Sequence, residues 1–323
     1  HEESVELLLK QYEVLLSEIT HDPSRSINCL NLRGKNESPV VEPQEQLGAA
    51  FHGGVISAFT QQVLRDSDAV AILNEDGQVR SYGWLDQRID SCVRELSKIG
   101  MLPGDRIGIY ANRSESLVVS VLAVMKMGGV FVILDSSYPD SRLAHLITLA
   151  RLKSVIILAE DWALGCELKT IQANQFMSQR AQPSVPICEV EGDDVAYVAF
   201  TSGSTGAPKL ILGKHSSLSA FLEWRRQSFD LRQDDVFSML SGLGHDPLHR
   251  DIFTPLMLGG RIAIPSEKTR LDADALHSWL VDSEVTVINA VPSMLKPLCS
   301  IQGKKRHDYS RLVFYSGELL EGD

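Results

Sequence analysis

The sequence lacks the features of several common protein classes. No apolar run approaches the ~20 residues that a helix needs to span a bilayer, so we expect no membrane partner. The five cysteines are scattered, with neither a CxxC pair nor a Cys/His spacing typical of metal sites. This predicts reduced thiols, a cytoplasmic location and no metal-ligating side chains. No serine lies in a GxSxG motif, so a hydrolase is not indicated.

An excess of basic residues is also missing. Lys and Arg number 31 against 42 Asp and Glu, which gives a net charge of −11 and argues against nucleic acid as a partner. A local site can still be positive in a protein whose total charge is negative. The 323 residues suffice for about two domains, and 44% hydrophobic content is ordinary for a globular protein. There is no signal peptide and the chain starts at His1, so we expect a piece of a longer protein.

Two regions differ in pattern. Residues 4–19 carry apolar side chains at helical spacing, which predicts an amphipathic helix that needs a partner surface. Residues 21–46 are polar and contain three prolines, as expected of a linker. We therefore predict a helix and linker over 1–46 and a separate domain over 47–323.

From residue 47 onward, short apolar strands alternate with helical segments, and after a polar stretch near 160–192 the pattern restarts. The expected strands are 69–73, 106–110, 130–134, 154–158, 195–200, 236–240, 261–264, 285–289 and 312–315. Helices are expected over 55–65, 83–99, 114–127, 140–151, 216–228, 248–258 and 272–282. This alternation predicts an α/β fold of two successive βαβ-type layers with mostly parallel sheets.

The segment from Thr201 to Lys209, TSGSTGAPK, follows a predicted buried strand. Glycines let backbone N–H groups approach phosphate oxygens, hydroxyls donate to them, and lysine supplies positive charge. It is not a Walker A loop, because Ala207 and Pro208 separate the last glycine from the lysine. We expect a loop between a strand and a helix that binds phosphates; by composition alone, a Gly/Ser/Thr-rich surface turn remains the alternative.

TSGSTGAPK after a strand resembles the phosphate-binding signature of the adenylate-forming superfamily. The segments RSYGWLDQRID (80–90), MKMGGVFVILDSSYPDSRL (125–143) and RLVFYSGELL (311–320) resemble, in the same order, segments of nonribosomal peptide synthetase adenylation domains. The resemblance covers about 47–323 and implies an acetyl-CoA synthetase-like fold that is truncated before the C-terminal subdomain. Residues 1–46 resemble the tail of a preceding condensation domain. One departure is Leu210, where the family usually has glycine after the loop lysine.

The resemblance also implies roles for individual residues. It assigns catalytic roles to Thr201, Lys209 and His245. It implies nucleotide binding by Thr201, Ser202, Gly203, Ser204, Thr205, Gly206, Lys209, Gly317 and Glu318. Because part of the family's catalytic set belongs to the C-terminal subdomain, this chain is expected to lack a complete set.

The segment SMLSGLGHDPLHRDIFTPLMLGG (238–260) carries the expected substrate pocket. Asp246 stands where amino-acid adenylation domains keep the aspartate that binds the substrate ammonium; the alternative is a helix cap, since Pro247 follows it. Arg250 lies one helical turn later, where it either enters the pocket or forms an intrahelical salt bridge with Asp246. A guanidinium in the pocket favours a carboxylate there. This segment is similar to the adenylation domain of fungal α-aminoadipate reductases.

The same register adds Pro247, Asn289, Phe314 and Ser316 to the substrate-binding residues, although Asn289 ends a buried strand and has a purely structural alternative. The expected activity is the ATP-dependent activation of an acidic amino acid as an aminoacyl adenylate. The expected cofactors are ATP and Mg²⁺. The expected partners are condensation and carrier domains, the latter with phosphopantetheine, in secondary metabolite biosynthesis. The alternatives are an acyl-CoA ligase or carboxylic acid reductase-type adenylation domain, and a non-catalytic docking fragment of a megasynthase.

Overall fold

A computed structural model describes residues 2–23, 54–164, 167–180, 182–202, 208–299 and 310–315. The chain divides into two compact units, His1–Leu47 and Gly48–Asp323. The first unit contains α1 (Glu2–His21), the predicted amphipathic helix, on which Leu9, Tyr12, Leu16 and Ile19 are exposed. Most of the predicted linker lies outside the described residues. The assignment of 1–46 to a condensation domain stays a prediction.

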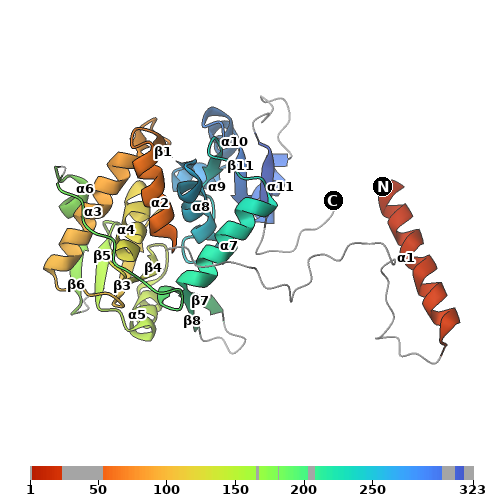
Figure 1. The fold of residues 1–323 in the computed structure, drawn as a ribbon, viewed down its shortest axis with the longest axis horizontal. Helices are drawn as coiled ribbons and strands as arrows, with labels where there is room; N and C mark the ends of the chain where they lie inside the picture. Colours follow the sequence, from red (N-terminus) through yellow and green to blue (C-terminus); the bar gives the residue numbers. More distant parts are fainter. Residues whose placement is uncertain are drawn as a thin grey trace. The chain divides into compact units, whose positions relative to one another are not determined.

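The second unit contains two six-stranded sheets with helices between and around them (Figure 1). The first sheet has the strand order β6-β5-β3-β4-β7-β8 and is parallel except for the last pair. Its strands are β3 (Arg106–Ala111), β4 (Val130–Asp135), β5 (Ser154–Ile157), β6 (Lys169–Gln172), β7 (Val195–Ser202) and β8 (Pro208–Lys214). Helix α3 (Tyr82–Lys98) precedes this stretch of chain, and α4 (Glu115–Lys126), α5 (Asp140–Ala150) and α6 (Asn174–Met177) lie within it.

The second sheet has the order β12-β11-β9-β10-β1-β2, parallel except for the β1–β2 hairpin. Its strands are β1 (Val70–Asn74), β2 (Val79–Ser81), β9 (Val236–Ser238), β10 (Arg261–Ile264), β11 (Val287–Ala290) and β12 (Leu312–Tyr315). The remaining helices are α2 (Gly54–Arg65), α7 (His215–Ser228), α8 (Pro247–Leu258), α9 (Glu267–Leu271), α10 (Ala273–Asp282) and α11 (Pro292–Cys299).

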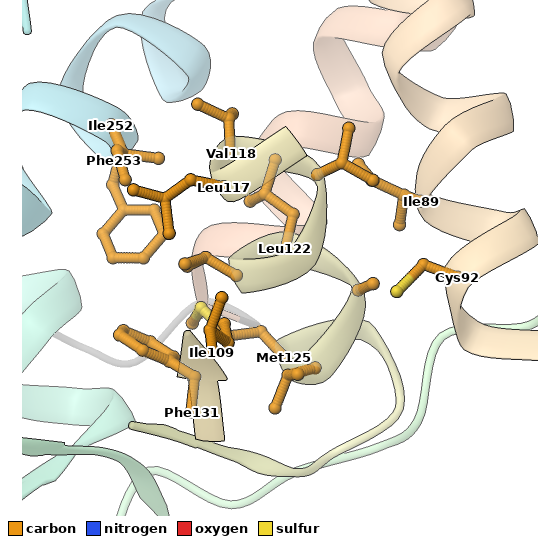
Figure 2. Packing of buried hydrophobic residues seen from close by; sticks show 14 of the residues in the cluster. Ile89, Cys92, Ile109, Leu117, Val118, Leu122, Met125, Phe131, Ile252 and Phe253 are labelled. Atoms are coloured by element: carbon orange, nitrogen blue, oxygen red, sulfur yellow. The ribbon is translucent and has the colours of Figure 1, made fainter. Parts of the chain in front are cut away.

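Helix α4 lies at the centre of the main core. Its apolar side chains Leu117, Val118, Leu122 and Met125 lie between residues of α3 and residues of α8 (Figure 2). Alternate residues of a strand point to opposite faces of the sheet, so β4 contributes side chains to two hydrophobic cores. Phe131 and Ile133 belong to the core around α4, whereas Val130, Val132 and Leu134 pack with α5 on the other face.

Helix α8 contacts both sheets. It packs against β9 and β10 of the second sheet. On its other side, the imidazole of His249 lies 4.2 Å from the ring centroid of Tyr197 and 5.3 Å from that of Phe131, both in the first sheet. The helix begins at Pro247, whose missing N–H is not needed at that position, and ends at Gly259, which adopts a left-handed backbone. Two ordinary end signals thus fix the length of the helix that bridges the sheets.

The α/β pattern forms as predicted, but β2, β6, β8, α6, α9 and α11 were not predicted. The segment after Thr201 leads into β8, so it connects two antiparallel strands, and the prediction of a strand-to-helix loop was wrong. Loop-like composition hid β8, because glycines and Pro208 dominate its surroundings. The polar stretch near 160–192 contains β6 and α6, whose few apolar residues gave a weak pattern. The β1–β2 hairpin precedes the first sheet in the chain but belongs to the second.

The buried position of His249 generates a prediction about stability and pH. Burial lowers the pKa of His249 from its ordinary 6.5 to about 4. As the pH falls from 6.5 towards 4, the unfolded chain binds a proton that the folded chain does not, so the free energy of unfolding decreases. We expect His249→Phe to remove up to about 3 kcal/mol of this decrease.

The measurement is the urea unfolding of the chain and of His249→Phe at pH 7.5 and pH 4.5. The difference between the two proteins isolates His249, since every other titrating group is shared. A stability difference that does not change with pH would contradict the buried, neutral state of this imidazole.

Candidate functional site

A cavity of about 690 Å³ opens where β7 ends, beside the turn that precedes α8. Three segments far apart in the sequence form its walls: the end of β7 with the start of β8, helix α5 with the residue Tyr138 before it, and residues 244–246. The lining residues are Ile133, Tyr138, Ser141, Arg142, His145, Leu146, Tyr197, Ala199, Phe200, Thr201, Pro208, Ile211, Gly244, His245 and Asp246. Ligands of open α/β sheets bind at the carboxyl ends of strands, and this cavity is at such an end.

The predicted phosphate-binding segment borders this cavity through Thr201, the next-to-last residue of β7. Lys209 pairs with Thr201 across the β7–β8 hairpin, so both side chains project from the same face, but Lys209 is exposed and is not among the lining residues. Ser202 ends β7 and pairs with Pro208. Gly203, Ser204, Thr205 and Gly206 lie outside the described residues, as do Ser316, Gly317 and Glu318.

Close approach to glycine shapes the wall formed by the hairpin. A Cβ atom on Gly213 would lie about 2.0 Å from the ring of Tyr197, its partner across the hairpin. The ring therefore lies directly over the backbone of β8, an arrangement that only glycine permits. This position also brings the ring against His249 and to the cavity wall.

The turn before α8 carries His245 and Asp246, which are exposed and line the cavity. The Asp246 side chain makes no capping hydrogen bond to α8, although the residue precedes the helix. Burial raises the pKa of the Tyr197 hydroxyl, and the nearby Asp246 carboxylate raises it further. Asp246 thus directs its negative charge towards the cavity wall rather than towards the helix end.

Arg113 and Asp251 bind backbone groups of residues 239–241, just before this turn, and neither was predicted as a site residue. The guanidinium of Arg113 donates to the carbonyl oxygens of Met239 (2.6 Å) and Ser241 (2.8 Å). The carboxylate of Asp251, which is fully buried on α8, accepts a hydrogen bond from the N–H of Ser241 at 2.9 Å. Burial raises the pKa of Asp251 to about 6, while the Ser241 N–H and Arg250 oppose this rise. Asp251 lies in the predicted pocket segment and Arg113 outside every quoted motif, and both bind backbone groups, which the sequence pattern does not reveal.

Arg250 does not pair with Asp246 as the four-residue spacing suggested. Its Nε atom lies 3.8 Å from Oδ1 of Asp251, and its side chain is only 12% exposed. Asn289 and Phe314 are neighbours on β11 and β12, and both contact a residue that the sequence analysis overlooked, Arg225 of α7. The Asn289 amide oxygen accepts from Arg225 rather than from a backbone group. The predicted site residues therefore form two groups, one in the cavity and one around Arg225.

Comparison with known proteins agrees with this architecture. The family described as AMP-binding enzyme matches residues 59–321. The chain is 27% identical to the L-2-aminoadipate reductase of Schizosaccharomyces pombe over 99% of its length and 25% of the reductase. It is 30% identical to the syringomycin synthase SyrB1 of Pseudomonas syringae over 87% of the chain and 47% of that protein. The crystal structure of the nonribosomal peptide synthetase FmoA3 in its AMPPNP-bound form superposes with a TM-score of 0.79 at 23% identity, covering 98% of this chain and 35% of that chain.

The chain belongs to the AMP-binding enzymes, a family of adenylate-forming, ATP-dependent ligases. Its fold is the adenylate-forming fold, so the predicted fold class is confirmed, and the chain covers the N-terminal part of an adenylation domain. It spans about a quarter of the reductase and less than half of SyrB1. Among the described residues, no helix is long and apolar enough to cross a membrane. Within the same ranges, no three His, Cys, Asp or Glu side chains gather to hold a metal ion.

The missing cap at α8 gives a test of what Asp246 does. We expect Asp246→Ala to change the free energy of unfolding of the chain by less than about 0.5 kcal/mol, because no hydrogen bond to the helix is lost. Asp272→Ala is the matched control, since the Asp272 side chain accepts from the N–H of Ala275 at 2.9 Å and caps α10. That control should cost about 1 kcal/mol.

Urea unfolding of the chain and of both variants at pH 7.5 makes the comparison. Equal destabilisation by the two substitutions would mean that Asp246 acts as a helix cap.

Proposed function

We propose that this chain activates an amino acid with ATP as part of a nonribosomal peptide synthetase or a related carrier-linked enzyme. The observation that carries the proposal is the shared cavity of Thr201, which borders the phosphate-binding segment, and Asp246, which follows His245 in the pocket segment. A nucleotide bound beside Thr201 and an amino acid bound at Asp246 would meet inside one cavity. Binding of AMPPNP by the related FmoA3 supports the nucleotide part.

The proposed reaction joins the two substrates at the α-phosphorus of ATP. A carboxylate oxygen of the amino acid forms a bond to this phosphorus, the bond to the bridging oxygen of the β-phosphate breaks, and pyrophosphate leaves. The residues contribute mainly positioning and charge neutralisation. Thr201 and the glycine-rich segment that follows it would donate to phosphate oxygens, Lys209 would supply positive charge, and His245 would lie beside the reacting carboxylate. Mg²⁺ would be bound through the phosphates of ATP.

The ammonium group of the substrate would bind Asp246. A carboxylate at a cavity wall that includes Ile133, Leu146 and Phe200 favours a cation and disfavours an uncharged acyl chain. This is the argument for an amino acid over the fatty acids that an acyl-CoA ligase takes. The product would pass to the phosphopantetheine thiol of a carrier domain, with a condensation domain as the second partner.

An acidic amino acid is the proposed substrate. Arg250 is almost buried, and an arginine in such a place favours an anionic occupant over an apolar side chain. The name of the Schizosaccharomyces pombe relative, L-2-aminoadipate reductase, agrees with a dicarboxylic amino acid. We favour activation of the side-chain carboxyl, with the α-carboxylate held by arginine.

A panel of ATP–pyrophosphate exchange reactions tests the substrate class in the whole protein that contains this chain. We expect L-2-aminoadipate, L-glutamate or L-aspartate to exceed leucine, phenylalanine and serine by about 100-fold in kcat/KM, because an amino acid with a neutral side chain has one carboxylate and cannot both react with ATP and pair with the guanidinium. The α-amide and the side-chain amide of the preferred acid then identify the activated carboxyl. Preference for a neutral amino acid would contradict the acidic assignment, and absence of exchange with every amino acid would contradict the proposed function.

Lys209 offers a test of the nucleotide half of the cavity. We expect Lys209→Ala to raise the KM for ATP about tenfold or more in the same exchange reaction, because a charged contact to phosphate is lost. Lys214→Ala is the matched control: it is exposed on the same strand and pairs with Asp193 at 2.8 Å. Similar KM values for the two variants would remove Lys209 from the nucleotide site.

A further inference from the structure

Arg225 of α7 is buried, with 2% of its surface exposed. Its guanidinium donates to Oδ1 of Asn289 at 3.2 Å and to Oγ1 of Thr254 at 3.4 Å. The same guanidinium lies 4.6 Å from the ring centroid of Phe314. Its direct contacts are therefore neutral amide, hydroxyl and aromatic groups.

The charges around Arg225 do not balance. Arg250 is close enough to lower the pKa of Arg225, which burial and this like charge together bring to about 10. Asp251 is the acidic group that faces both arginines, and it lies 3.8 Å from Arg250 while already accepting from the Ser241 N–H. Among the described residues, no carboxylate reaches Arg225 within ion-pair distance. Arg225 and the largely buried Arg250 thus share one carboxylate, which Arg113 also faces, and an uncompensated buried charge is costly.

Hydrogen-bond donors without acceptors gather at the same place. Nε of Arg250 and Nδ2 of Asn289 are both buried and have no hydrogen-bond partner within the described ranges. Oδ1 of Asp251 also lacks a hydrogen-bond partner and lies 3.8 Å from Nε of Arg250, so one carboxylate oxygen faces the donors of two arginines and of Asn289. Buried donors in excess of the acceptors around them are rare in folded proteins and indicate a missing acceptor. The forked N–H groups of arginine match the two oxygens of a carboxylate.

We propose that Arg225 and Arg250 together bind one carboxylate of the substrate, with Asn289 as an additional donor. Arg225 would then determine specificity for dicarboxylic amino acids. Neither arginine lines the cavity of Thr201, His245 and Asp246, so the carboxylate they bind is the one that does not react with ATP. This inference rests on the proposed function, because it assigns the residues that bind the non-reacting carboxylate of the same substrate.

The test is the discrimination between an acid and its amide in ATP–pyrophosphate exchange by the whole protein. The probes are L-2-aminoadipate and its two monoamides, and discrimination is the kcat/KM of the acid divided by that of the monoamide that keeps the reacting carboxyl. We expect Arg225→Met, which keeps an unbranched apolar stem but removes the guanidinium and its charge, to lower this ratio about 100-fold. Arg225→Lys keeps the charge but loses the fork, and it should lower the ratio about tenfold.

Arg226→Met is the matched control, because Arg226 is the next residue of α7 but is exposed and pairs with Glu223. Its discrimination should equal that of the wild type. A purely structural role for Arg225 would slow exchange with acid and amide alike and leave the ratio unchanged, which would overturn the inference. If Arg225→Met does not fold, as judged by circular dichroism, the ratio for Arg225→Lys decides in the same way.

The outcomes also separate this inference from the proposed function. A wild-type protein that favours the acid, together with an Arg225→Met variant that favours it equally, overturns the role of Arg225 alone. A wild-type protein that activates neutral amino acids in preference overturns the inference while adenylation stands. No exchange with any amino acid overturns both.

Discussion

Helix α8 packs on β9 and β10 of the second sheet while His249 and Phe253 reach Phe131 and, through His249, Tyr197 of the first. This contact fixes the distance between the sheets at the place where the cavity opens. The turn before the helix carries His245 and Asp246 into that cavity, and the body of the helix carries Arg250 and Asp251 into the protein. A displacement of α8 would therefore move both groups of site residues together.

Buried polar side chains hold the backbone just before the turn that leads into α8. Arg113 donates to the carbonyl oxygens of Met239 and Ser241, just after β9, and Asp251 accepts from the Ser241 N–H that lies between them in the chain. Side chains thus satisfy both acceptors and a donor of this backbone segment. Buried backbone groups need such partners where a strand stops pairing. The surrounding network holds more positive than negative charge. A protein interior tolerates that excess best when a ligand supplies the missing anion.

Much of the fold and part of the site followed from the sequence, for identifiable reasons. β4 and α4 are continuous apolar segments bounded by glycines and a serine cap, so periodicity located them within a residue or two. Asp246 and Thr201 stood in motifs, and the structure brings both to one cavity. β8 was missed because its alternation is weak, and Arg225 because two adjacent arginines on a polar-looking helix do not reveal which of them is buried. Its burial depends on β11 and β12, which lie far along the chain.

The placement of β1 has a consequence for how the chain folds during synthesis. Ile72 of β1 pairs with Ile262 of β10, so the strand leaves the ribosome long before its parallel neighbour exists. The first sheet draws its strands from the stretch between them and is complete at β8, before β9 is made. Domains tend to fold in the order of synthesis, and pairings between distant residues form slowly. The β1–β2 hairpin therefore remains without its neighbour β10 after the first sheet has formed. During this time the unpaired edge of β1 is exposed to association with other nascent chains.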